Sequence, residues 1–388
     1  MKILQIMTSR ANGGAETYAC DVMTRLHQAG VEQCVVMHKD AERFTGLEAL
    51  GIRMAPAPLS VPFAPAQRFL LRGLTAREQP TIVQTWMRRA ASLVSKAEQP
   101  VIGWFGGYYE PRHFQNCDRL VGVTKDIVAH MVKKGIVPDR AHYIPTFPVI
   151  AEMPSVDRAT LATPQDAKVL LTLSRLHEKK GLDTFLHALK ELPGCYAWLA
   201  GDGPLEGQLK DLARNLRVEQ RVRFLGWRTD RSALLGAADI CVLPSRYEPF
   251  GTVILESWAA KTPLVACASA GPAAHVIEGI NGLLTPIDDA AALTAAIARV
   301  LSDHTLRSRL IENGHNSYEK DYTPEAVTAQ WIEFYKWVED NDCSPSSTLP
   351  AIGPTSQPKL RRPCRSRPSS LRRKFLTIQC WRTLTQPL

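Results

Sequence analysis

The sequence predicts an α/β protein made of two successive doubly wound, parallel-sheet domains. Short buried-strand runs alternate with helical patterns along the chain, and this alternation starts a second time at residue 168. The chain has 388 residues, which is long enough for two domains with separate cores. Hydrophobic residues make up 45% and charged residues 22% of it, which is the composition of an ordinary soluble globular protein.

The first half opens with a parallel strand–helix–strand unit. Residues 3–7 predict a strand, residues 12–15 a glycine turn, and residues 31–37 the next strand. The intervening helix has one apolar face, which consists of Ala19, Val22, Met23 and Leu26. Further buried-strand runs follow at residues 81–86, 101–105 and 120–123.

The second half repeats the alternation after a connecting segment at residues 153–167, which contains Pro154 and Pro164. Strands are predicted at residues 168–174, 196–200, 222–224, 239–243 and 264–268. Helical patterns cover residues 290–301, 305–319 and 324–338. Doubly wound sheets bind ligands at the carboxyl ends of their strands, so we expect the functional site there, in the cleft between the domains.

The net charge of +9 belongs to the end of the chain. Nine of the 47 Lys and Arg residues follow Asp342, whereas none of the 38 Asp and Glu residues does, so residues 1–342 have no formal net charge. The sequence therefore does not indicate a nucleic-acid-binding fold. Residues 343–388 are rich in Ser, Pro and Arg and lack periodicity, which predicts a basic disordered tail.

The sequence also indicates where in the cell the protein is expected and whether it has a metal site. No apolar stretch is long enough to span a bilayer, and the N-terminal run is too short for a signal peptide. Nine cysteines without a Cys-x-x-Cys pair predict buried free thiols in a reducing cytoplasm. The histidines form no ligand pair, and the one Asp-x-Asp string, residues 340–342, ends the last helix, so no metal site is expected.

The most informative segment follows the strand predicted at residues 239–243. Glu248 lies in the loop after it, and Gly251 allows the backbone to approach a ligand closely. The helix that begins at Thr252 presents N–H groups that favour phosphate, and side chains such as Glu256 tilt toward this end. N–H groups for a diphosphate and carboxylates for hydroxyls suit a sugar nucleotide. The alternative is that both glutamates are solvated.

Two other loops carry matching chemistry. Gly13 and Gly14 lie between a strand and a helix, where glycine allows a phosphate to reach the helix N-terminus. Arg175 and Lys180 follow the strand at residues 168–174, and their guanidinium and ammonium groups suit a departing diphosphate. An ordinary turn and solvated loop charges are the respective alternatives.

Residues 248–256 resemble a known motif. The string Glu-Pro-Phe-Gly, with a second Glu eight positions after the first, is similar to the Glu-x7-Glu motif of the family 4 retaining glycosyltransferases (glycosyltransferase group 1), which have the GT-B fold. The resemblance implies that Glu248 faces the donor sugar and acts in catalysis, and that Glu256 holds the ribose hydroxyls. The remaining donor-binding residues that it implies here are Phe250, Gly251, Thr252 and Val253.

The resemblance extends to the other loops. The Gly-Gly-Ala-Glu turn of Gly13 and Gly14 is similar to the family's turn beside the donor diphosphate and the acceptor. Arg175 and Lys180 match a segment that clamps the leaving diphosphate, which implies a catalytic role for both. Two sites are implied to line the nucleotide pocket, Gly201 in a Gly-Asp-Gly-Pro turn and Trp227 near the base; Asp202 would be either pocket lining or a helix cap.

The resemblance implies two Rossmann-like domains that face a cleft. Residues 1–155 would form the acceptor side and residues 156–320 the nucleotide-sugar side. Residues 321–342 would return to the N-terminal domain, and residues 343–388 would form the tail. The expected partners are a nucleoside-diphosphate sugar and a glycan or glycolipid acceptor, and neither a metal nor a further cofactor is expected. Peripheral contact with an anionic membrane at the cytoplasmic face is indicated separately by Arg68, Arg72, Arg77, Arg88 and Arg89, for which solvated helix faces are the alternative.

The implied function is transfer of a sugar to a saccharide or lipid-linked glycan, in lipopolysaccharide or other cell-surface polysaccharide synthesis. One departure stands out. Many family members carry a His facing the reacting sugar where this chain has Gly106, and His113 follows seven residues later. A GT-B sugar-nucleotide epimerase and a catalytically silent sugar-nucleotide-binding protein therefore remain the alternatives.

Overall fold

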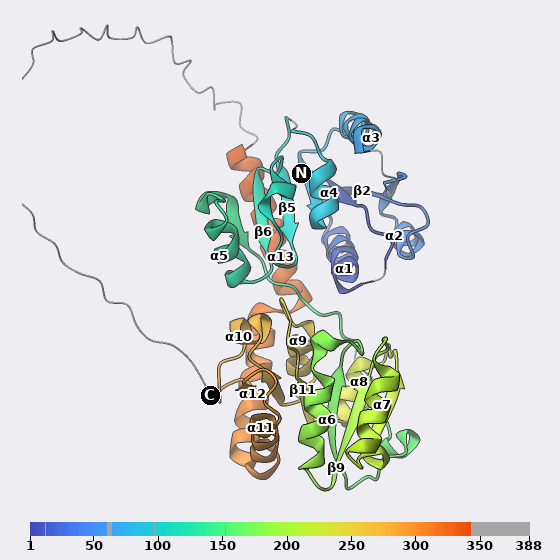
Figure 1. Cartoon of the computed structure of the whole chain (residues 1–388). Coiled ribbons are helices and arrows are strands. Elements are labelled where there is room, and N and C mark those ends of the chain that lie inside the picture. The colour runs from blue at the N-terminus through green and yellow to red at the C-terminus, as the bar shows by residue number, and fades with distance from the viewer. Residues whose placement is uncertain (12, 60–63, 97, 152, 343–388) are drawn as a thin grey trace, which may run out of the picture. The chain divides into compact units, whose positions relative to one another are not determined.

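The computed structural model describes residues 1–342 apart from residues 12, 60–63, 97 and 152. The segment for which a basic tail is predicted, residues 343–388, lies outside the described residues. Within the described part the chain forms two parallel sheets covered by helices (Figure 1), which confirms the predicted fold class. No helix there has the length and apolarity needed to cross a bilayer.

The first sheet has seven strands in the order β3-β2-β1-β4-β5-β6-β7. Its strands are β1 (Lys2–Met7), β2 (Glu32–Met37), β3 (Arg53–Pro56), β4 (Ile82–Trp86), β5 (Val101–Phe105), β6 (Arg119–Gly122) and β7 (Ala141–Tyr143). Its helices are α1 (Gly14–Gln28), α2 (Phe44–Ala49), α3 (Ala64–Glu78), α4 (Met87–Leu93) and α5 (Lys125–Lys133). All strand pairs are parallel, and every residue of β4 and β5 is buried, as expected for central strands that are covered on both faces. The edge strands β3 and β7 are short and were not predicted.

The second sheet has six strands in the order β10-β9-β8-β11-β12-β13. Its strands are β8 (Lys168–Leu173), β9 (Cys195–Ala200), β10 (Val222–Gly226), β11 (Ile240–Leu243), β12 (Leu264–Cys267) and β13 (Leu283–Thr285). Its helices are α6 (Leu182–Lys190), α7 (Glu206–Asn215), α8 (Arg231–Ala237), α9 (Thr252–Ala259), α10 (Ala270–His275), α11 (Ala290–Ser302) and α12 (His304–Asp321). The six cysteines of the described residues are buried and unpaired, as predicted.

The strand order of each sheet reverses next to its first strand. In the second sheet, β8 pairs with β9 on one side and with β11 on the other. The loops that follow β8 and β11 therefore leave the sheet toward opposite faces and open a crevice at its carboxyl edge. This is the edge at which the loops of Lys180 and Glu248 emerge.

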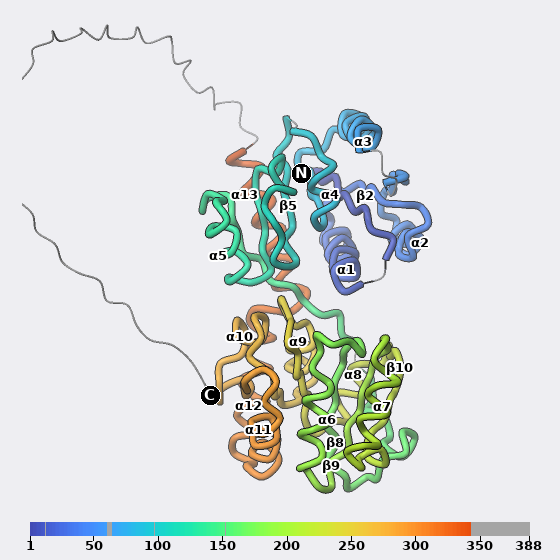
Figure 2. Tube along the Cα trace, viewed as in Figure 1, coloured from blue at the N-terminus to red at the C-terminus, as the bar shows by residue number. Residues whose placement is uncertain are grey.

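The last described helix, α13 (Pro324–Asp342), packs against the elements of the first sheet rather than the second. It contacts α1, and Figures 1 and 2 show it among the elements of the first sheet. The Asp342 carboxylate accepts two hydrogen bonds from the Arg119 guanidinium, at 2.7 and 2.6 Å. The Tyr335 hydroxyl donates to Gln84 Oε1 of β4 at 3.2 Å. Helix α13 thus completes the core around the first sheet.

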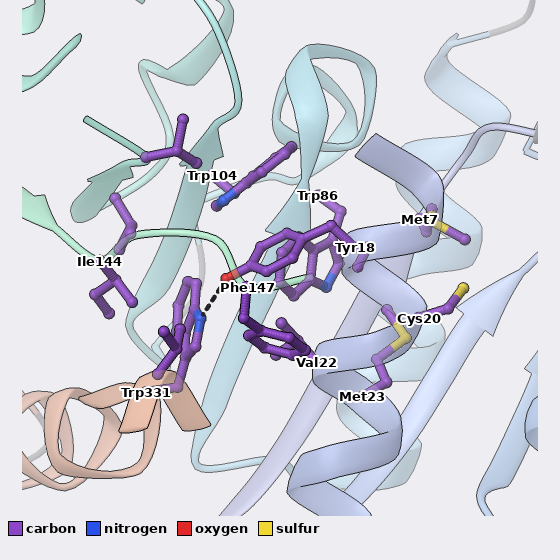
Figure 3. Close-up of a cluster of buried hydrophobic side chains, with 14 of the residues drawn as sticks. Met7, Tyr18, Cys20, Val22, Met23, Trp86, Trp104, Ile144, Phe147 and Trp331 are labelled. Atoms are coloured by element: carbon purple, nitrogen blue, oxygen red, sulfur yellow. Dashed lines mark hydrogen bonds between the residues drawn. The ribbon is translucent and has the colours of Figure 1, made fainter. Parts of the chain in front are cut away.

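An aromatic cluster fastens α13 to that core (Figure 3). Tyr18 of α1 stacks on Trp104 with ring centroids 5.6 Å apart, and Trp86 lies 5.7 Å from Trp331. The Trp331 indole N–H donates to the Tyr18 hydroxyl at 3.1 Å, so its one polar group is satisfied in the interior. Trp331 is completely buried, so its ring contributes to holding the helix on the first sheet.

We expect Trp331→Ala to lower the free energy of unfolding by about 3–5 kcal/mol, because it removes a fully buried aromatic ring and leaves a cavity. Urea denaturation followed by circular dichroism measures the loss. Trp227→Ala is the matched control, since its ring is 66% exposed. If Trp331→Ala lowers the free energy of unfolding no more than Trp227→Ala does, the cluster does not anchor α13.

Candidate functional site

The loop between β11 and α9 is fixed by its glycine and by the next helix. Gly251 caps α9 in the left-handed region, with φ of +89°, and no side chain caps this end of the helix. The Gly271 N–H of α10 donates to the Glu248 carbonyl at 2.7 Å. A Cβ at Gly271 would lie 2.3 Å from the Phe250 carbonyl oxygen, so only glycine allows this contact. The backbone that carries Glu248, Phe250 and Gly251 is therefore held by short contacts.

Glu248 forms an ion pair with Lys180. The Lys180 ammonium lies 2.5 Å from Glu248 Oε2, and the side chains are 23% and 15% exposed. The two residues come from loops after different strands, β8 and β11, and are 68 positions apart in the sequence. An ammonium has three N–H donors, so this bond leaves two for another acceptor. The structure thus brings together two of the residues that the sequence predicts for donor binding.

Glu256 lies on α9 and is almost completely buried, with 2% exposure. Its Oε1 accepts a hydrogen bond from the Arg231 guanidinium of α8, while Oε2 has no partner among the described residues. Burial raises the pKa of Glu256 above its ordinary value, and Arg231 opposes that rise. A small pocket beside these side chains is also lined by Thr229 and Ser232. A buried carboxylate oxygen without a partner costs free energy until a donor reaches it, which is consistent with a hydroxyl-binding site.

Arg231 was not identified from the sequence. It lies 25 positions from Glu256, and no local spacing relates the two. Ser245 and Ser269, which follow β11 and β12, were not identified from the sequence either. Their hydroxyls are buried and have no partner among the described residues. A serine two positions after a buried strand was the one signal that pointed to them.

The loop that carries Arg175 rests on the Gly-Asp-Gly-Pro turn after β9. Gly201 has φ of +150°, and a Cβ there would lie 2.0 Å from the Ser174 carbonyl oxygen. The Asp202 carbonyl accepts from the Leu176 N–H at 2.7 Å. The Arg175 side chain extends from this loop and is exposed.

One interpretation of Asp202 is wrong. We considered it as the cap of the following helix, but α7 starts at Glu206, its N-cap is Leu205, and no side chain caps it. The backbone of Asp202 is instead used to hold the Arg175 loop. The turn therefore supports the loop after β8 through main-chain contacts.

Other predicted residues lie apart from these contacts. Gly13 is the N-cap of α1 without a side-chain cap, and Gly13 and Gly14 are both exposed, so this helix end is open to solvent. Trp227 follows β10, and its ring is exposed. The structure thus joins the Arg175 loop to the turn at Gly201, and it joins Lys180 to Glu248. Neither group of contacts includes Gly13, Gly14 or Trp227.

Gly106 has a structural reason to be glycine. A Cβ at this position would lie 2.3 Å from the Trp104 ring, which fills the space where a side chain would begin. Trp104 is buried and belongs to the aromatic cluster of Figure 3. His113 lies in a 3-10 turn, Pro111–Phe114, and is half-buried. In the part of the chain that the structure describes, no three His, Cys, Asp or Glu side chains are grouped so as to hold a metal ion.

Comparison with known proteins gives the family. Residues 12–147 match the model described as Glycosyltransferase Family 4, and residues 155–317 match Glycosyl transferases group 1. The chain is 34% identical over 335 residues to the lipopolysaccharide core biosynthesis glycosyltransferase LpsE of Rhizobium meliloti (strain 1021), covering 83% of this chain and 95% of LpsE. Its identity to LpsD of the same organism, also a lipopolysaccharide core biosynthesis glycosyltransferase, is 31% over 350 residues, covering 86% and 98%.

Solved structures agree with the fold. A glycosyltransferase from Rickettsia africae superposes with a TM-score of 0.76 at 20% identity, covering 88% of this chain and 99% of that one. Anabaena HepE in complex with UDP-glucose superposes with a TM-score of 0.73 at 21% identity, covering 87% and 100%. These levels of identity establish similarity of fold. Together with the relatives above, they show that this chain belongs to the family 4, group 1 glycosyltransferases and has the GT-B fold.

Proposed function

We propose that this chain is a retaining glycosyltransferase that moves a sugar from a nucleoside-diphosphate sugar to a glycan or glycolipid, in the synthesis of lipopolysaccharide or a related cell-surface polysaccharide. The two relatives of at least 31% identity, both named for lipopolysaccharide core biosynthesis, support this choice of acceptor class. We further propose residues 1–155 as the acceptor-side domain, residues 156–320 as the donor-side domain and residues 321–342 as the returning helix.

One observation carries the proposal: two carboxylates flank the open N-terminus of α9, and each is held by a cation. Glu248 precedes the helix and pairs with Lys180, and Glu256 lies on the helix and pairs with Arg231. Oε2 of Glu256 is buried and has no hydrogen-bond partner among the described residues. A ribose hydroxyl would donate to it and so satisfy it. Glu248 would accept from hydroxyls of the donor sugar.

The diphosphate would bind between these carboxylates. Main-chain N–H groups at Gly251, Thr252 and Val253 start α9, where backbone dipoles favour negative charge. Lys180 would use its remaining donors on the phosphate while keeping its bond to Glu248. Arg175 would add a fork of donors to the leaving group, whose charge grows as the glycosidic bond to phosphate breaks. Gly201 and Trp227 would border the nucleotide.

Transfer with retention of configuration does not require a side chain of the protein to act as a general base. The bond from the anomeric carbon to the phosphate oxygen breaks, and the acceptor oxygen forms its bond on the same face of the sugar. The departing phosphate oxygen takes the proton that the acceptor hydroxyl loses. Glycine at position 106, enforced by Trp104, is compatible with this route. Gly13 and Gly14 would lie where diphosphate and acceptor meet.

Two measurements separate this function from its alternatives. A thermal-shift screen against nucleoside-diphosphate sugars is expected to identify a stabilising donor. The bound donor is then incubated with and without a lipopolysaccharide core acceptor, and the products are separated by mass spectrometry. Sugar transfer that depends on acceptor supports the proposal; isomerised donor without acceptor indicates an epimerase, and binding without any turnover indicates a silent protein.

We predict that activity does not require a divalent metal, because the proposed diphosphate site consists of Arg175, Lys180 and main-chain N–H groups. Initial rates are compared in EDTA and after addition of Mg²⁺ or Mn²⁺. Unchanged rates are expected. Loss of turnover in EDTA that either cation restores would contradict the prediction.

The two glutamates are predicted to fail differently when replaced. Glu256→Gln weakens charge-assisted hydrogen bonds to a ribose that does not change during transfer, so donor KM should rise by about ten- to a hundredfold for a loss of roughly 1.5–3 kcal/mol. Glu248→Gln acts beside the reacting sugar, where positive charge develops, so kcat should fall more than KM rises. Steady-state kinetics on the purified variants measure both.

Glu312→Gln is the matched control, because this residue is exposed on α12. It is expected to leave both constants unchanged. If Glu248→Gln and Glu256→Gln also behave like wild type, the pair has no role in donor binding. A kcat defect confined to Glu256→Gln would reverse the two assigned roles.

A further inference from the structure

One face of α10 covers the Glu248 loop, residues 244–251. Gly271 and His275 lie four positions apart on this helix, so they share a face. The Gly271 N–H donates to the Glu248 carbonyl at 2.7 Å. The centroid of the His275 ring lies 4.5 Å from that of the Phe250 ring. The loop is therefore supported by α10 at two points, through a backbone contact and through a ring contact.

His275 is a polar side chain in an apolar environment. It is 8% exposed, and the Tyr322 ring lies perpendicular to it at 5.7 Å between centroids. Burial lowers the pKa of His275 to about 4, so the imidazole is neutral near pH 7. Its Nε2 is buried and has no hydrogen-bond partner among the described residues. A leucine would fill this space without an unsatisfied nitrogen, so packing alone does not account for a histidine here.

The other ring nitrogen of His275 provides what a leucine lacks. Nδ1 forms a hydrogen bond with the Tyr322 hydroxyl at 3.2 Å. Tyr322 follows α12, and its hydroxyl is also hydrogen-bonded to Tyr143 of β7. An imidazole can otherwise rotate over a broad range about the bond between Cβ and Cγ. The bond to Tyr322 therefore holds the His275 ring in one orientation against Phe250.

The backbone at this end of α10 has supports of its own. The Asn281 side chain, 2% exposed, donates from Nδ2 to the His275 carbonyl at 3.3 Å and accepts from the Ile277 N–H at 2.7 Å. The Asn281 carbonyl accepts from the Trp258 indole N–H of α9 at 2.8 Å. These contacts do not involve the imidazole, so a substitution of the His275 side chain leaves them available.

We propose that His275 is a positioning residue for sugar transfer: its bond to Tyr322 fixes the ring against Phe250 and so holds Glu248 where the donor sugar requires it. The inference rests on the proposed function, in which Glu248 contacts that sugar. Phe250 and Glu248 lie two positions apart in one short loop, so a shift of the Phe250 ring displaces the carboxylate. Such a displacement weakens binding of the transition state more than binding of the ground state. His275 acts through the loop and contacts no reacting atom.

Tyr322→Phe and His275→Leu test the proposal, because each removes the hydrogen bond and keeps a bulky side chain. Each is expected to lower kcat about tenfold, the effect of one lost hydrogen bond, and to change donor KM less than about threefold. The double variant should lose no more than either single variant, since both remove the same bond. Tyr143→Phe is expected to keep kcat, because it leaves the bond between Tyr322 and His275 intact. Steady-state kinetics are measured well below the Tm of each variant.

A second double-mutant cycle shows whether the effect passes through Glu248. In the Glu248→Gln background, His275→Leu is expected to leave kcat unchanged, because the carboxylate that the ring positions is already absent. A persistent tenfold loss in that background would overturn the proposal. Wild-type kcat in both Tyr322→Phe and His275→Leu would also overturn it.

His142→Leu is the matched control. The His142 ring lies 4.8 Å from the Phe334 ring between centroids, and its Nε2 is likewise buried without a partner among the described residues. His142 belongs to β7 of the first sheet, away from the Glu248 loop. The control is expected to keep kcat even if it lowers the Tm. A tenfold loss of kcat in the control would assign the effect to lost stability and would contradict a positioning role.

Hydrogen exchange provides a measurement that does not depend on sugar transfer. The amides of residues 244–251 are expected to exchange about tenfold faster in Tyr322→Phe and His275→Leu than in wild type, and at the wild-type rate in His142→Leu. If wild type transfers no sugar but exchange rises in this way, the proposed function fails and the support of the loop by His275 stands. If wild type transfers sugar and neither exchange nor kcat responds to the two variants, the proposed function stands and the positioning role fails.

Discussion

The pairing of β8 with β9 on one side and β11 on the other is the constraint on which the site depends. It makes the loops after β8 and β11 leave the sheet at the same edge toward opposite faces. Lys180 and Glu248, 68 positions apart, meet there at 2.5 Å. Without that strand order neither residue would have its partner.

The charged groups of the site are held by backbone contacts rather than by one another alone. The Glu248 loop is fixed through Gly271, and the Arg175 loop through Gly201, where any side chain would collide with a carbonyl oxygen. A rigid backbone spares the site the entropy of ordering these loops when a ligand binds. Glu256 differs from these groups, because its buried Oε2 has no hydrogen-bond partner among the described residues, which costs free energy until a donor reaches it.

Two further arrangements of buried groups lie around the first sheet. The aromatic cluster of Tyr18, Trp104 and Trp331 attaches the last helix to the first sheet, and the same Trp104 ring excludes a side chain at Gly106. A residue that looks like a lost functional group in the sequence is thus explained by packing. Charge is likewise partitioned: Glu78 is buried among cations, and the exposed arginines of α3 remain on the surface.

The sequence by itself determined the fold class, the central strands and the position of the Glu248 loop between a strand and a helix, because these depend on local signals: apolar runs and glycine turns. It did not identify the edge strands β3 and β7, which are short and incompletely buried. Only the tertiary structure decided that Arg231 pairs with Glu256, that Asp202 supports a loop instead of capping α7, and that Trp104 occupies the space beside Gly106. Each of these depends on which distant segments become neighbours, and no local pattern encodes that.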